Sequence, residues 1–107
     1  MSEIEKEFTS YLWEQLAKAQ AHGYVDHDGI YAGMLERYGG VGTAKQLIAS
    51  YGRNADNAKS QAGLKQLAKL GLLEFSTEAA MLTSQFKRLF TKHERDIADW
   101  RLRYPNE

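Results

Sequence analysis

Large apolar side chains recur at every third or fourth position along much of the chain, which is the spacing of one face of an α-helix. The first such stretch spans residues 4–16, and Gly23 ends the helix that it predicts. A second stretch spans residues 30–38 and stops at Gly39, because glycine readily adopts the left-handed conformation that terminates helices. We therefore expect two helices, separated by a turn, in the N-terminal part of the chain.

Polar residues that can cap a helix precede the second and third apolar stretches. Asp26 or Asp28 stands before residues 30–38, and either carboxylate can accept hydrogen bonds from the free backbone N–H groups of a first helical turn. Thr43 offers its hydroxyl in the same way to a third helix, whose buried side would lie within residues 47–51.

The pattern changes after the third stretch. Residues 53–61 contain no large apolar side chain, so nothing in them can anchor the segment to a core, and we interpret them as a polar loop. Apolar residues at helical spacing return over residues 64–70 and end at Gly71. The run at residues 72–75 fits a turn, an extended link or a small strand, and Ser76 then begins another short helix.

The clearest helix boundary lies near the C-terminus. Thr91, with Glu94 three positions later, has the spacing of a capping box. This signal predicts a final helix that begins after Thr91, runs through Ile97, Trp100, Arg101 and Tyr104, and ends at Pro105. No alternation of apolar and polar residues is long enough for a strand. The sequence therefore predicts an all-α fold, a compact bundle of five or six short helices that forms a single domain over residues 1–107.

The composition adds exclusions to this picture. The 14 Lys and Arg residues balance 14 Asp and Glu residues, so a surface that binds nucleic acid or anionic lipid throughout is not expected. No apolar run reaches the roughly 18 residues of a membrane span, and the acidic N-terminus lacks the features of a signal peptide. Cysteine is absent, which excludes thiol chemistry and is typical of a reducing compartment. We expect a cytoplasmic protein with no membrane partner.

Charge is distributed unevenly along the chain although it sums to zero. Residues 1–42 carry seven acidic and three basic residues, whereas residues 43–72 carry five basic residues and one acidic residue. A basic segment of this kind is either a solvated face or a docking surface for an acidic partner, protein or nucleic acid. The candidate contact residues are Lys45, Arg53, Lys59, Lys65 and Lys69.

Motifs for catalysis or cofactor binding are incomplete in this sequence. Residues 39–45 resemble a phosphate-binding loop, but Lys45 comes two positions too late. Residues 26–37 begin like a calcium loop, but their twelfth position is Arg37 in place of a carboxylate. The three histidines lack a spacing that presets a metal site, and no acid–base pair can be nominated. We predict no enzyme activity, no metal and no cofactor.

One stretch is similar to the helix-turn-helix of winged DNA-binding domains. Residues 43–52 and 64–71 would supply its two helices, and residues 72–75 would lead into the wing. However, about a dozen residues separate these helices, whereas a turn of three or four is usual, and no second wing strand follows. Nucleic-acid binding through the basic segment 43–72 is therefore kept as an alternative.

Four segments combine glycine stops with helix start signals in a recognisable order: residues 39–45 (GGVGTAK), 63–71, 76–79 (STEA) and 89–94. With these segments, the stretch from Gly39 to Leu102 resembles a family of small bacterial helical proteins that has no known function. The resemblance implies a shared helical scaffold. It implies no catalytic residues.

Aromatic residues are numerous for a bundle of short helices. Most of them stand at positions compatible with core packing, but some of those near the two chain ends must lie close to the surface. Trp, Tyr and Arg are the residue types enriched at binding hot spots. We therefore expect Trp100, Arg101 and Tyr104 to join the basic residues at a partner-binding surface.

Together these observations predict a non-enzymatic protein–protein interaction module, an adaptor or regulator that docks on a larger protein through a helical face. The basic segment favours a partner with an acidic surface. A small inhibitor of a bacterial enzyme, such as an anti-defence protein of a mobile element, is one alternative. The nucleic-acid binder described above is the other.

Overall fold

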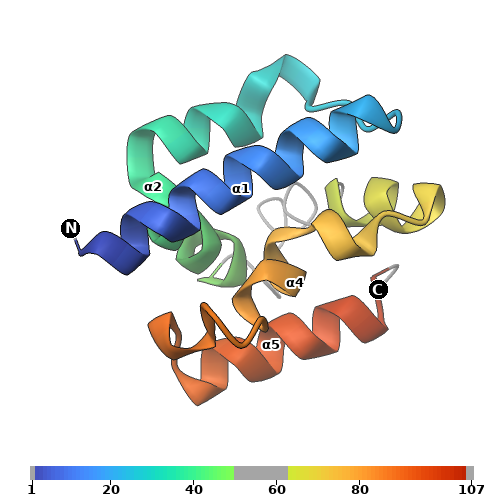
Figure 1. Cartoon of the computed structure of the whole chain (residues 1–107). Helices are drawn as coiled ribbons and strands as arrows, with labels where there is room; N and C mark the ends of the chain where they lie inside the picture. Colours follow the sequence, from blue (N-terminus) through green and yellow to red (C-terminus); the bar gives the residue numbers. More distant parts are fainter. Residues whose placement is uncertain (1, 50–62, 106–107) are drawn as a thin grey trace.

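Helices make up the regular structure of the chain, as its periodicity predicts. The computed structural model describes residues 2–49 and 63–105, and within these ranges it holds helices and turns but no strand, so the all-α prediction is confirmed. α1 packs against α2, and α4 packs against α5 (Figure 1). The elements in chain order are α1 (Glu3–Ala21), η1 (His27–Gly29), α2 (Ile30–Ala49), a helix at residues 63–70, η2 (Leu73–Phe75), α4 (Thr77–Met81), η3 (Lys87–Leu89) and α5 (Lys92–Arg103).

Three sequence-based expectations fall on residues outside the described ranges. These are the polar loop at residues 53–61, the two candidate contacts Arg53 and Lys59, and the expected burial of Tyr51. None of the helices in the described ranges is both long and apolar enough to cross a membrane.

α1 begins at a capping box and buries one face along its whole length. The Ser2 hydroxyl accepts from the Glu5 backbone N–H, and the Glu5 carboxylate accepts from the Ser2 backbone N–H at 3.0 Å. These bonds satisfy N–H groups that have no partner inside the helix. The predicted apolar stripe is buried, with Phe8, Leu12 and Leu16 in the interior.

α2 includes both the helix predicted over residues 30–38 and the helix predicted after Thr43, because the chain bends at Gly39 and continues as a helix immediately afterwards. Gly39 has φ 73° and ψ 176°, so the predicted stop is real but lasts one residue. The prediction that Thr43 caps a new helix is wrong: Thr43 lies inside α2 and is buried. The helix restarts earlier, because the Thr9 hydroxyl of α1 accepts from the Gly40 backbone N–H at 2.8 Å.

The C-terminal part follows the predicted boundaries closely. Gly71, with φ 73°, ends the helix at residues 63–70, and the run after it forms a turn, η2, rather than an extended link or a strand. The Ser76 hydroxyl caps α4 by accepting from the Ala79 backbone N–H at 3.0 Å. The Thr91 capping box of α5 is present with both of its hydrogen bonds.

The main core lies where α1, α2, α4 and α5 meet. The ring centroid of Phe8 lies 5.1 Å from that of Phe86 and 5.3 Å from that of Phe90, and both pairs pack edge to face. Such pairs contribute beyond the area that they bury. Met81 and Ala98, which are fully buried, bring α4 and α5 into the same cluster.

Candidate functional site

A cavity of about 890 Å³ opens between the C-terminal end of α1, both ends of α2, the helix at residues 63–70 and the segment from η2 to α4. Its volume lies in the range typical of binding sites. The apolar part of its lining comes from all of these elements and includes Leu16, Met34, Leu47, Leu64, Leu67 and Phe75.

The turn between α1 and η1 forms one side of the cavity mouth. Gly23, with φ 105°, lets the chain leave α1 sharply. The Gln66 side chain then holds this turn from the neighbouring helix: its Oε1 accepts from the Val25 N–H at 2.7 Å, and its Nε2 donates to the Val25 carbonyl at 3.1 Å. Because the backbone of Val25 is fixed in this way, its side chain stands at the mouth and is 51% exposed.

Ile30 is the second apolar side chain at the mouth. It begins α2 and is 59% exposed. Its position is fixed by Asp26, which accepts from the backbone N–H groups of Tyr31 and Ala32, each at 3.0 Å. The capping role predicted for Asp26 or Asp28 therefore belongs to Asp26, because Asp28 adopts φ 57° within η1.

Two tyrosines and a threonine place hydroxyl groups in the lining. The Tyr31 hydroxyl is hydrogen-bonded to the Thr77 hydroxyl, which joins α2 to α4. Burial raises the pKa of Tyr31, and the negative charges of Glu78 and Asp26 raise it further. Burial, followed by the same two charges, also raises the pKa of Tyr24. Both phenols are therefore protonated at neutral pH and can donate as well as accept.

A buried ion pair stands behind this part of the lining. Glu78 of α4 lies with its Oε2 3.0 Å from Nε of Arg101 in α5, and an Arg101 terminal nitrogen donates to the Leu47 carbonyl at 3.0 Å. Glu78 lines the cavity, whereas the Arg101 side chain is fully buried. The pair connects three helices at the base of the site.

The expectation that Arg101 is a surface contact is wrong. Arg101 is 1% exposed and is engaged by Glu78 and Leu47, because its position three residues after Ala98 puts it on the buried face of α5. The other two aromatic candidates remain accessible. Trp100 is half-buried with its ring 5.1 Å from that of Tyr104, which is exposed.

The basic candidates in the described ranges have different surroundings. Lys65 and Lys69 lie one turn apart on the helix at residues 63–70, are exposed and line the cavity. Lys45 lies elsewhere, with its Nζ 2.9 Å from both carboxylate oxygens of Glu94. Burial raises the pKa of Glu94, but hydrogen bonds from Thr91 and Lys45 outweigh burial and leave that pKa below its ordinary value of 4.5.

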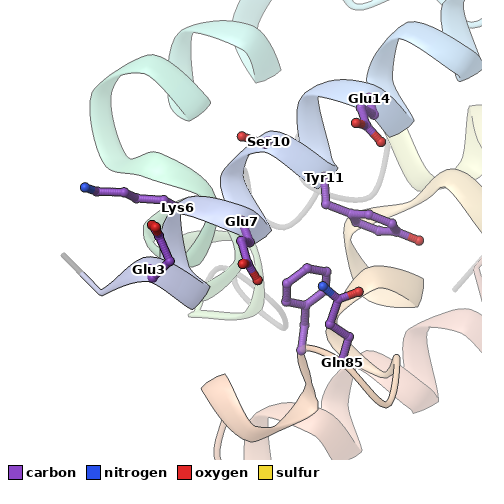
Figure 2. Close-up of a pocket in the computed structure, with 8 residues that line it drawn as sticks. Glu3, Lys6, Glu7, Ser10, Tyr11, Glu14 and Gln85 are labelled. Carbon is purple, nitrogen blue, oxygen red and sulfur yellow. The ribbon is translucent and has the colours of Figure 1, made fainter.

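A second hollow of about 410 Å³ lies along α1 and is polar. Figure 2 shows Glu7 and Tyr11 pointing from α1 toward Gln85, while Lys6 extends away. Its other lining residues are Glu3, Ser10, Glu14 and Phe86. The chain therefore presents an apolar cavity with lysines at its mouth and, apart from it, a shallow groove lined by glutamates.

The histidine and carboxylate positions do not converge within the part of the chain that the structure describes: no group of three His, Cys, Asp or Glu side chains there could hold a metal ion. His22, one of the three histidines of the chain, uses Nδ1 in a 2.8 Å hydrogen bond with the Lys18 carbonyl.

Comparisons with protein-family models, with curated proteins and with solved structures find no match to this chain. The site is therefore interpreted from its own geometry. Sequence reasoning identified Lys65 and Lys69 but missed Glu78, Tyr24 and Tyr31. One signal was available: an arginine at the spacing of the buried face of α5 requires a buried acceptor.

Proposed function

We propose that this protein is a non-enzymatic interaction module that binds a segment of a partner protein in the cavity between α1, α2 and the helix at residues 63–70. The segment carries apolar side chains, which enter the cavity, and acidic side chains, which face the lysines at its mouth. The observation that carries the proposal is the cavity mouth, where Val25 and Ile30 stay more than half exposed above apolar walls and two lysines flank them. Exposed apolar side chains gathered around a concavity are typical of an interaction site.

The charge of the mouth supports an acidic partner. Lys65 and Lys69 lie one turn apart and project from the same face of their helix. Complementary charges of this kind accelerate association and fix the register of the bound segment, while apolar contacts inside the cavity supply most of the affinity. The acidic groove along α1 lies apart from this mouth and would repel such a partner.

Site-specific photo-crosslinking tests this proposal. A benzophenone amino acid replaces Ile30 at the mouth or, as the matched control, Tyr38, which is also exposed on α2 but does not line the cavity. We expect a discrete protein adduct from position 30 and none from position 38 when the chain is expressed in its native host. The double variant Lys65→Glu, Lys69→Glu should reduce the adduct strongly, because it reverses the charge at the mouth.

Two results would contradict the proposal. Equal adducts from positions 30 and 38 would place the partner elsewhere on the molecule. Retention of the adduct by the charge-reversed variant would exclude the two lysines from recognition. If the same variant instead abolished a salt-sensitive shift of duplex DNA, the nucleic-acid alternative would be favoured.

A further inference from the structure

Carboxylate oxygens form part of the polar lining of the cavity among the described residues. Asp26 and Glu78 both line it, and an ionised carboxylate only accepts. Each Asp26 oxygen receives one backbone N–H, and Glu78 Oε2 faces Arg101. Because a carboxylate offers about four lone pairs, both groups keep acceptor capacity after these contacts.

The hydroxyl groups of Tyr31 and Thr77 also belong to the lining. Tyr31 and Thr77 bond to each other, so one of their two protons is already used between them. Each hydroxyl oxygen also carries lone pairs that can accept. An N–H or O–H donor that enters this part of the cavity therefore meets oxygen atoms that can accept from it.

The charged side chains that line the cavity form two groups of opposite sign. Asp26 and Glu78 act on the two phenols, because burial and then these two negative charges raise the pKa of Tyr24 and Tyr31. Arg101 does not line the cavity, and its charge lies behind Glu78. Lys65 and Lys69, in contrast, are exposed, so the outer edge is positive.

We propose that the cavity selects an aromatic side chain that carries its own hydrogen-bond donor, a tyrosine or a tryptophan, flanked by acidic residues in the partner segment. This inference rests on the proposed function and specifies the group that is recognised. The ring packs between apolar side chains such as Met34, Leu47 and Phe75, and its O–H or N–H donates to the hydroxyl oxygens of the Tyr31–Thr77 pair. The flanking carboxylates pair with Lys65 and Lys69 at the mouth.

The test uses synthetic peptides that differ in one group. Acetylated, amidated heptapeptides with glutamates around a single central tyrosine, phenylalanine or alanine are titrated into the ¹⁵N-labelled protein and followed by NMR. We expect cavity resonances to shift, with the tyrosine peptide binding about 3- to 10-fold more tightly than the phenylalanine peptide, which is the usual contribution of one hydrogen bond. The alanine peptide should be weaker than both, because it buries no ring.

Protein variants identify the acceptors. Tyr31→Phe and Thr77→Val each remove one hydroxyl with little change in shape, and either should shrink the preference for tyrosine over phenylalanine to less than about 2-fold. Tyr38→Phe is the matched control, because Tyr38 lies on the same helix outside the cavity and should leave the preference unchanged.

The outcomes separate the two proposals. If the tyrosine and phenylalanine peptides bind equally and the alanine peptide does not, the docking site stands and the selection of a donor is wrong. If no peptide moves the cavity resonances at millimolar concentration, or if shifts appear only along the α1 groove or around Tyr104, the proposed function fails as well. A preference for tyrosine that survives both Tyr31→Phe and Thr77→Val would assign the acceptor elsewhere and overturn the inference.

Discussion

Two apolar clusters within the described part of the chain differ in how completely they are enclosed. The main core around Phe8 is sealed by four helices, and its rings pack edge to face. The smaller cluster is built on Ala19, Leu67 and Leu72, and two of these side chains also face the cavity. Enclosed contacts stabilise the fold, whereas an open apolar wall leaves contact surface for another molecule. The chain thus separates the region that stabilises it from the region that we propose binds.

Equal truncations in the two clusters should have unequal effects. Leu12→Ala in the main core should cost about 4 kcal/mol of unfolding free energy, because the surrounding side chains leave an empty cavity there. Leu67→Ala should cost about 2 kcal/mol, because this side chain already borders open space and loses fewer contacts. Urea unfolding followed by circular dichroism measures both values.

The controls for this pair are internal. Both substitutions remove the same atoms from helical positions, so helix propensity and transfer terms cancel in the comparison. A Leu67→Ala cost equal to that of Leu12→Ala would mean that the smaller cluster is as tightly packed as the main core. In that case the open cavity wall would not be present in solution.

The Glu78–Arg101 pair lies on the border between the two regions, and breaking it should have the next largest effect. Arg101→Met leaves the Glu78 carboxylate and the Leu47 carbonyl without their donor, at a cost of about 3 kcal/mol. Arg103→Met on the same helix is the matched control. Its partner Asp99 lies 3.0 Å away but both side chains are exposed, so the loss should stay below about 0.5 kcal/mol.

A second substitution makes this prediction sharper. Adding Glu78→Gln to Arg101→Met removes the uncompensated charge, so part of the lost stability should return. If the double variant is instead less stable than Arg101→Met alone, Glu78 is held by contacts other than the ion pair. Thermal and urea unfolding of the three variants distinguish these cases.

Much of the fold was predictable because its signals are local. Apolar spacing and capping residues within a few positions identify α1, α4 and α5, and Gly39 marks the bend in α2. The failure at Thr43 came from a contact between distant segments. The Thr9 hydroxyl accepts from the backbone N–H of Gly40, where the helix begins again after the bend. Thr43 is therefore not needed as a cap.

The candidate site was predictable only in part. The basic character of Lys65 and Lys69 follows from sequence alone, because surface charge needs no partner. The cavity, in contrast, is assembled from elements that are distant along the chain. In the sequence, Glu78 has the position of an acidic residue in the first turn of a helix, and only the fold shows that it pairs with Arg101. Single-sequence reasoning holds no information on such pairings.

Two glycines on α2 test the difference between the regions with a single methyl group. Gly40 faces the main core, where an added Cβ would lie 2.8 Å from the Thr9 Cα and 3.0 Å from the Phe8 ring. Gly33 lies in the first half of the same helix, and an added Cβ there would meet nothing within 4 Å. Gly40→Ala should therefore cost about 2 kcal/mol, because α1 and α2 must move apart to accept it.

Gly33→Ala should instead stabilise the protein by up to about 1 kcal/mol, because alanine has the higher helix propensity and no clash opposes it. Urea unfolding of the two variants measures the change in unfolding free energy. The two changes are expected to differ in sign, so the comparison does not depend on the exact size of either. A gain at Gly40 would show that α1 and α2 approach less closely than their geometry here requires. A loss at Gly33 would mean that the first half of α2 is covered in solution, and the open cavity mouth beside it would then have to be reconsidered.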